Sequence, residues 1–131
     1  MSSPSVRVLI AEDEIMIAGL IEATLQDEGL AATVAYSGSE ALTAISADPT
    51  GFQVLITDIR VGAPPDGWGV AHAAREANPA IGVIYITGDS MEAWRANGVP
   101  ASILIAKPFV PAQIVTAVMT LLNQPAAAPA P

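Results

Sequence analysis

Five residues with reactive or metal-binding side chains stand at the ends of short apolar runs in this sequence. Glu12 and Asp13 follow the first of these runs, and Asp58, Thr87 and Lys107 come at the ends of three later ones. Short, nearly continuous apolar runs are typical of buried parallel strands, and ligands in open α/β sheets bind outside the carboxyl ends of such strands. We therefore expect three carboxylates, a hydroxyl and an ammonium group to meet at one edge of a sheet.

The three carboxylates predict a magnesium site. Carboxylates held within a few ångströms of one another repel and need a cation among them. Mg²⁺ prefers carboxylate oxygens and is usually held by one or two protein carboxylates, together with waters and phosphate oxygens. Asp13 and Asp58, with Glu12 in support, offer this set. The single histidine, His72, falls within a predicted helix away from any strand end, so zinc is disfavoured and we assign His72 no role.

Asp58 is the candidate nucleophile at the centre of this set. A carboxylate can attack phosphorus and form an acyl phosphate, as aspartate does in other proteins. The transition state spreads negative charge over the phosphoryl oxygens, which the ammonium of Lys107 and the hydroxyl of Thr87 can stabilise. Taken singly, each residue has an ordinary structural interpretation, such as a helix-terminal charge or a loop cap. Their succession at four strand ends favours phosphoryl chemistry.

The elements that must position these residues alternate along the chain. Five runs predict strands, and the segments between them show helical spacing of apolar residues, with Ser37 and Glu40 forming a capping signature. The predicted strands are 6–11, 31–36, 53–57, 82–87 and 102–106. The predicted helices are 14–28, a segment capped by Ser37, 67–77, 90–97 and a segment that starts near Pro111. This alternation predicts an α/β fold: a flavodoxin-like, doubly wound, five-stranded parallel sheet with strand order 2-1-3-4-5 and five helices.

Composition narrows the class of protein. The chain has 131 residues, 52% of them hydrophobic, which suits one domain over 6–123, with 1–5 as an N-terminal extension and 124–131 as a disordered Pro/Ala tail. It contains no cysteine, so thiolate metal sites and cysteine nucleophiles are excluded. A net charge of −8 disfavours nucleic acid binding. No apolar run or leader predicts contact with a membrane, so we expect a cytoplasmic protein.

Four segments, in this order, resemble the signatures of response regulator receiver domains. They are VLIAEDE at 8–14, VLITD at 54–58, YITG at 85–88 and KPF at 107–109. The resemblance spans residues 6–123. It implies a phosphoacceptor in a two-component system or phosphorelay rather than an enzyme. The implied partners are a histidine kinase or histidine phosphotransfer protein and a downstream protein target, and a homodimer is possible.

The resemblance also assigns roles in the metal site. It implies that Asp58 is the phosphoacceptor, that Asp13 ligates Mg²⁺ directly and that Glu12 acts through a metal-bound water. The backbone carbonyl of Arg60 would complete the protein ligands. Around the phosphoryl group it implies contacts from Thr87 and Lys107, a cis peptide bond between Lys107 and Pro108, and control of water access by Arg60 and Asp89.

Three features depart from the family pattern. Gly62 stands where the loop after the acceptor usually has proline, and the connection to the next helix is longer. Leu104 replaces the usual aromatic residue three positions before the lysine. We therefore expect the output surface to involve Trp94 together with Leu104 rather than an aromatic switch. No output domain follows the fifth helix, so an isolated receiver part of a larger regulator or hybrid kinase is an alternative.

Two other functions share this fold class. An aspartate-nucleophile phosphatase of the haloacid dehalogenase type also combines Asp, Thr and Lys at strand ends. Its second acid is missing, because Arg60 occupies that position. A flavodoxin needs a hydroxyl-rich phosphate loop after the first strand, where Glu12, Asp13 and Glu14 would repel a phosphate.

Overall fold

A five-stranded parallel sheet forms the centre of the molecule. The computed structural model describes residues 6–88 and 91–124. The strands, in the order β2-β1-β3-β4-β5, are β1 (Arg7–Ala11), β2 (Ala31–Ala35), β3 (Val54–Asp58), β4 (Gly82–Thr87) and β5 (Ile103–Ala106). The helices are α1 (Ile15–Asp27), α2 (Gly38–Ala47), α3 (Gly67–Ala77), α4 (Met91–Asn97) and α5 (Pro111–Leu122). The predicted fold class and strand order are confirmed.

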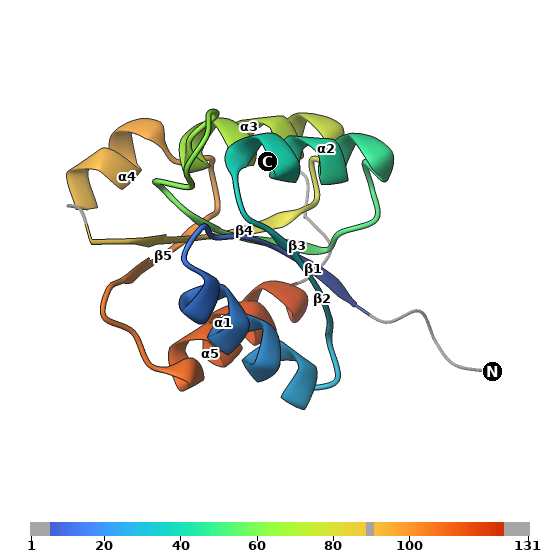
Figure 1. Cartoon of the computed structure of the whole chain (residues 1–131), viewed down its shortest axis with the longest axis vertical. Helices are drawn as coiled ribbons and strands as arrows, with labels where there is room; N and C mark the ends of the chain where they lie inside the picture. Colours follow the sequence, from blue (N-terminus) through green and yellow to red (C-terminus); the bar gives the residue numbers. More distant parts are fainter. Residues whose placement is uncertain (1–5, 89–90, 125–131) are drawn as a thin grey trace.

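The helices cover both faces of the sheet. α1 and α5 lie together on one face, and α2, α3 and α4 lie on the other (Figure 1). Alternate strand residues feed two separate cores: Leu9, Leu55 and Tyr85 face the α2 and α3 side, whereas Ile10 and Ile56 face α1 and α5. A strand buried on both faces needs apolar residues at every position, which is why the central runs lack polar alternation.

The helix termini follow local sequence signals. The side chain of Ser37 caps α2 by accepting a hydrogen bond from the Glu40 amide at 3.1 Å. The return bond of the predicted capping box is shifted by one residue, because Glu40 Oε1 accepts from the amide of Tyr36 at 2.9 Å instead of from Ser37. Asp66 caps α3, and Gly29, with a φ of +79°, follows α1 in the left-handed conformation that glycine adopts without strain.

Predicted and observed boundaries differ by a residue or so. The predicted 67–77 is the observed α3, and the predicted 82–87 is β4. The first helix starts at Ile15 because Glu14 is its N-cap. The predicted N-terminal extension 1–5, Asp89, Ser90 and the tail beyond residue 124 lie outside the described residues. None of the helices in the described part has the length and apolarity that a membrane span requires.

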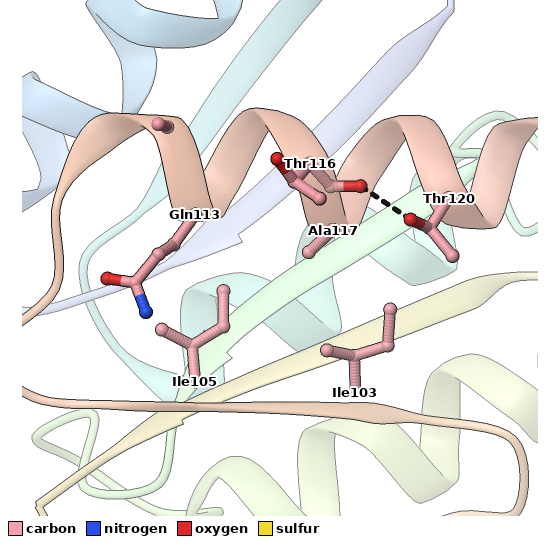
Figure 2. Close-up of a pocket in the computed structure, with 7 residues that line it drawn as sticks. Ile103, Ile105, Gln113, Thr116, Ala117 and Thr120 are labelled. Carbon is pink, nitrogen blue, oxygen red and sulfur yellow. Dashed lines mark hydrogen bonds between the residues drawn. The ribbon is translucent and has the colours of Figure 1, made fainter.

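β5 is an edge strand and leaves a groove beside α5. Strand β5 pairs with β4 alone in the described sheet. Between it and α5 lies an open groove of about 390 Å³, with Ile103 and Ile105 on the strand side and Gln113, Thr116 and Thr120 on the helix side (Figure 2). Ile103 is half-buried and Ile105 is buried, so Ile103 exposes part of its apolar side chain in this groove.

Candidate functional site

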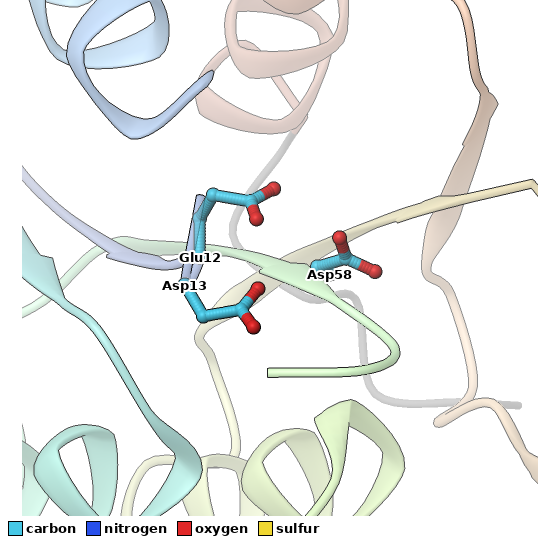
Figure 3. Close-up of side chains that lie close together, drawn as sticks. All are labelled: Glu12, Asp13 and Asp58. Atoms are coloured by element: carbon cyan, nitrogen blue, oxygen red, sulfur yellow. The ribbon is translucent and has the colours of Figure 1, made fainter. Parts of the chain in front are cut away.

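The five predicted residues converge at the carboxyl edge of the sheet. Carboxylate oxygens of Glu12, Asp13 and Asp58 lie within 4.8 Å of one another, and the Glu12 and Asp13 side chains extend from the end of β1 toward Asp58 (Figure 3). A cavity of about 360 Å³ opens beside them. Its lining is Asp13, Glu14, Asp58, Ile59, Arg60, Thr87, Gly88 and Lys107. Parallel pairing of β1, β3, β4 and β5 produces this convergence.

Asp58 is held by Lys107 at the end of β3. Its side chain is 10% exposed, and Lys107 Nζ lies 2.5 Å from Oδ2. The other oxygen, Oδ1, accepts a hydrogen bond from the Arg60 amide at 3.2 Å. Burial alone lowers the pKa of Lys107. The hydrogen bond to Asp58 and the charges of Asp58, Glu12 and Glu14 outweigh burial and raise this pKa, so Lys107 stays an ammonium group.

Glu12 is the most buried member of the acidic set. Its side chain is 1% exposed, and Oε2 accepts from the Glu14 amide at 3.1 Å. Oε1 has no hydrogen-bond partner among the described residues, and Lys107 Nζ is 3.9 Å away. Burial raises the pKa of Glu12 from 4.5 to about 7, although the Glu14 amide opposes the shift. A buried carboxylate oxygen without a partner is rare and indicates a missing donor, such as a metal-bound water.

The charges and donor atoms of the site fit a hard divalent cation. With all three carboxylates ionised, which a bound cation favours, they and the ammonium give −3 + 1 = −2, and a cation of charge +2 balances this charge. Carboxylate and backbone carbonyl oxygens are ligands that Mg²⁺ accepts, and Mg²⁺ commonly keeps several waters. The unpartnered Glu12 Oε1 provides an acceptor for one of those waters. The residues at the carboxyl edge of the sheet therefore fit the Mg²⁺ ion that the sequence predicts.

The burial of Glu12 leads to a pH-dependent prediction for the metal-free protein. Because its folded pKa of about 7 lies above the ordinary value of 4.5, the contribution of Glu12 to stability is complete below pH 4.5 and is lost as pH rises through 7. When pH rises from about 5 to about 8, the unfolding free energy of Glu12→Gln should fall by roughly 1–3 kcal/mol less than that of wild type. Urea denaturation in a chelator measures this difference. Identical pH slopes for the two proteins would contradict the effect.

The remaining predicted site residues surround the same cavity. Thr87 is buried at the end of β4, and its carbonyl accepts a hydrogen bond from the Lys107 amide at 2.9 Å. The Lys107–Pro108 peptide bond is cis, the geometry that the resemblance implies. Arg60 lines the cavity with an exposed side chain. Asp89, predicted to act with Arg60, lies outside the described residues.

The predicted output residues lie away from the cavity. Trp94 is half-buried on α4, and its Nε1 donates to Ser102 Oγ at 2.9 Å. Leu104, also half-buried, is the register partner of Tyr85 and packs against the same core as Trp94. His72 is exposed and contacts the Asn97 carbonyl at 3.0 Å. Trp94, on α4, and Leu104, on β5, therefore pack against the same hydrophobic core.

Some contacts at the site were absent from the sequence reasoning. Gly67 packs so closely under the Asp58 carbonyl that a β-carbon would collide with it, and its amide donates to Ile59 at 2.7 Å. The amide of Glu14 holds the buried Glu12. The role of Glu14 could have been found from the sequence, because Glu14 is adjacent to the acidic pair. The position of Gly67 could not, because it depends on the preceding loop, which includes a cis Pro64–Pro65 bond.

Comparisons with curated proteins agree with this geometry. The family model described as "Response regulator receiver domain" matches residues 8–119. A response regulator named as NtrX-like from Rickettsia typhi is 38% identical over 105 residues, which are 78% of this chain and 22% of that protein. The transcriptional regulatory protein DltR from Streptococcus agalactiae is 33% identical over 106 residues, 79% of this chain and 46% of that protein. The chain thus spans less than half the length of these two relatives.

Solved structures give the same result. A response regulator receiver protein from Sinorhizobium medicae has a TM-score of 0.87 at 42% identity, covering 93% of this chain and 98% of that chain. The receiver domain of Francisella response regulator 1452 has a TM-score of 0.78 at 28% identity, with 89% and 96% covered. The family match, these similarities and the acidic cluster at the sheet edge together establish that the chain belongs to the response regulator receiver domains of two-component signalling.

Proposed function

We propose that Asp58 accepts a phosphoryl group from a phosphohistidine on a histidine kinase or histidine phosphotransfer protein. Receiver domains are phosphoacceptors that bind Mg²⁺ at an acidic pocket and are not classical enzymes. We further propose that residues 6–123 form the receiver unit and that output occurs through contact with a downstream protein. The observation that carries the proposal is the contact between Lys107 Nζ and Asp58 Oδ2, 2.5 Å, beside the open cavity.

Asp58, Lys107 and Thr87 have different roles in the proposed phosphoryl transfer. A carboxylate oxygen of Asp58 attacks phosphorus, a new O–P bond forms, and the N–P bond of the donor breaks with its electron pair going to the imidazole. Lys107 keeps its proton, and its ammonium group can move from the Asp58 oxygen to a phosphoryl oxygen. Thr87, across the cavity, offers a hydroxyl to another oxygen. These two residues stabilise charge where it accumulates.

Asp13, Asp58 and the carbonyl of Arg60 would hold the Mg²⁺ ion, with Glu12 acting through a bound water. When bound, the ion supplies positive charge that offsets the negative oxygens of the transferring group. The Arg60 amide, which donates to Asp58 Oδ1 at 3.2 Å, fixes the orientation of the nucleophile. Glu14 does the same for Glu12 through its amide. The chain therefore orients two of the three carboxylates through its backbone.

Chemical mapping of the modified residue tests the proposal. The protein is incubated with Mg²⁺ and a small acyl phosphate and then treated with borohydride, which reduces an aspartyl phosphate to homoserine. We expect the conversion in the peptide that contains Asp58. Conversion at another aspartate, or a protein that hydrolyses the acyl phosphate continuously without any conversion, would overturn it. The second result would favour a phosphatase.

Trp94 is expected to report the phosphorylated state. Movement of Thr87 toward a phosphoryl oxygen pulls the end of β4, which α4 follows in the chain, and Trp94 on α4 bonds to Ser102. The chain has two tryptophans, so Trp68→Phe leaves Trp94 as the only indole. We expect phosphorylation to change Trp94 fluorescence in this variant and to leave the fluorescence of Trp94→Phe nearly unchanged. A phosphorylated Trp68→Phe protein with unchanged emission would contradict this coupling from Thr87 to Trp94. In the proposed coupling, Leu104 packs in the core and does not act as a gate.

Arg60 and Asp89 are proposed to control how long the phosphoryl group survives. Hydrolysis needs water in line with the aspartyl oxygen, and Arg60 lines the same cavity as Asp58. Asp89 lies outside the described residues, so its part remains a prediction from sequence.

A further inference from the structure

Strand β2 forms the edge of the sheet opposite β5. It pairs with β1 alone among the described strands (Figure 1). The Ala31 amide donates to the carbonyl just before β1 at 2.9 Å, and the Ala35 carbonyl accepts from the Glu12 amide at 3.0 Å. The backbone groups of successive residues in a strand point to opposite sides, so residues 31, 33 and 35 bond to β1. Ala32 and Val34 therefore direct an amide and a carbonyl each to the open side.

The open side of β2 lacks the features that usually protect an edge strand. Proteins blunt such edges with charged side chains, proline or β-bulges. The sequence of β2 is AATVA, and its pairing with β1 is continuous over all five residues. After the strand, the outward amide of Tyr36 donates to Glu40 Oε1 at 2.9 Å, which ends the row of unpaired groups. The amides and carbonyls of Ala32 and Val34 are left for an incoming strand.

An open groove lies beside this edge, between β2 and α2. Its volume is about 360 Å³, and its lining includes Val34 on the strand and Thr43, Ala44 and Ala47 on the helix. Glu40 also lines the groove, and its side chain is exposed. The small helix residues leave room for a side chain of a strand added to β2. The groove therefore offers apolar contact together with a carboxylate.

The half of the chain that surrounds β2 is strongly acidic. Between Arg7 and Arg60 there are nine acidic residues and no lysine, arginine or histidine. Exposed acids stand on both sides of β2 in the sequence: Asp27 and Glu28 precede it, and Glu40 follows it. Such an edge attracts a strand with basic ends and repels a second copy of this chain, whose net charge is also −8. Charge complementarity therefore favours a basic partner.

We propose that β2 docks an extended, basic peptide segment of a partner protein, which adds to the sheet as a sixth strand. An incoming strand of either direction can bond to all four outward groups of Ala32 and Val34. Its backbone supplies hydrogen bonds, its alternate side chains face the groove beside α2, and its lysines or arginines meet Glu28 and Glu40. No residue lines both this groove and the cavity at Asp58, so the proposal does not depend on the phosphoacceptor role.

Fluorescence anisotropy of a labelled peptide tests the proposal without a phosphoryl donor. The probe has a Val-Thr-Val-Thr-Val core with two lysines at each end. A short strand edge buries less area than stable complexes do, so we expect a dissociation constant on the order of 10–100 µM. Raising the salt from about 0.05 M to about 0.5 M should weaken binding at least about threefold, because salt screens the charges. No binding, or binding that salt strengthens, would overturn the proposal.

Two control peptides separate backbone pairing from charge. Replacing the lysines by glutamates keeps the core and reverses the charge, which should weaken binding at least about tenfold. N-methylation of every core residue keeps the lysines but removes the amides that donate to the Ala32 and Val34 carbonyls. This peptide should also bind at least about tenfold more weakly. Equal binding of the N-methylated peptide would show that charge alone attracts it and would overturn the added strand.

Hydrogen exchange locates the docking edge. In the free protein, the outward amides of Ala32 and Val34 should exchange much faster than the Ala31 amide, which is bonded beside β1. Saturation with the lysine peptide should slow exchange of the two outward amides at least about tenfold. Slowing at β5 or α4 instead would overturn the placement. Slow exchange of both amides without peptide, in a protein that sediments as a dimer, would give the edge to a second copy.

Protein variants provide a matched comparison. Ala32→Pro removes one outward amide without removing a bond to β1, since proline is tolerated on edge strands where its nitrogen faces solvent. It should weaken peptide binding at least about fivefold in a protein whose melting temperature shows that it is folded. Glu28→Lys and Glu92→Lys change the net charge equally at exposed positions, but Glu92 lies on α4.

Glu28→Lys should weaken binding at least about threefold at about 0.15 M salt, where screening confines charge effects to near neighbours, and Glu92→Lys should leave it nearly unchanged. This pair decides the placement even if Ala32→Pro fails to fold. Equal affinities of Glu28→Lys and Glu92→Lys for the lysine peptide would overturn docking at β2.

Discussion

Asp58→Asn is expected to abolish phosphorylation by a small acyl phosphate. The wild-type protein should gain the mass of one phosphoryl group, and the variant should react at least about a hundredfold more slowly, a difference of about 2.7 kcal/mol in activation free energy. The physical reason is that a carboxamide lacks the anionic oxygen that attacks phosphorus. The carboxamide keeps the size of the side chain and can still accept the Arg60 hydrogen bond, so loss of the adduct would reflect lost chemistry. Intact mass spectrometry over time measures the rates.

The matched control is Asp66→Asn. Asp66 is an exposed aspartate that caps α3 through a 3.0 Å bond from the Gly69 amide, and it lies outside the cavity lining. Asparagine is an equally good cap, so this variant should be phosphorylated at the wild-type rate. An adduct of equal yield on Asp58→Asn would refute the assignment of the acceptor. A slow rate in Asp66→Asn would show that the assay responds to general damage.

Mg²⁺ is expected to stabilise the unphosphorylated protein, and Asp13→Asn should remove most of this effect. At a concentration one hundred times its dissociation constant, a ligand that binds only the folded state adds about 2.7 kcal/mol. For a domain of this size, that corresponds to a rise in melting temperature on the order of 10 °C. Asp13 contributes a charge to the cluster of three carboxylates, so its loss leaves a weaker site. Thermal denaturation with Mg²⁺ and with chelator measures both proteins.

Two comparisons make this prediction specific. Asp48→Asn removes an exposed carboxylate that pairs with Arg7 and should keep the full response to Mg²⁺. In chelator, Asp13→Asn should be slightly more stable than wild type, because it removes repulsion from Glu12 and Asp58. The ligand assignment fails if Asp13→Asn responds to Mg²⁺ as wild type does. A gain in stability with monovalent salt alone would indicate screening rather than binding.

Much of the fold was predictable from local sequence. Continuous apolar runs specified strands buried on both faces, and the alternation with helices required parallel crossovers. Ser37 and Gly29 marked helix ends through capping and positive φ. The shifted bond from Tyr36 to Glu40 was not predictable, because it depends on how the chain leaves β2. Boundaries therefore moved by a residue while element types stayed as predicted.

The candidate site was predictable as a group of residues but not as an arrangement. Strand ends in a parallel sheet must share an edge, so the sequence determined that three carboxylates, Thr87 and Lys107 meet. It could not show that Glu12 is buried with an unpartnered oxygen while adjacent Asp13 is exposed. That contrast arises because successive side chains at a strand end point to opposite sides.

The sequence by itself therefore determined the chemistry available and the parallel α/β fold, because residue type and apolar patterning are local properties. Only the tertiary structure decided the 2.5 Å contact between Lys107 and Asp58, the close packing of Gly67 and the groove between β5 and α5. These features join segments far apart in the chain. Their geometry depends on how strands and helices pack together, which local sequence patterns do not specify.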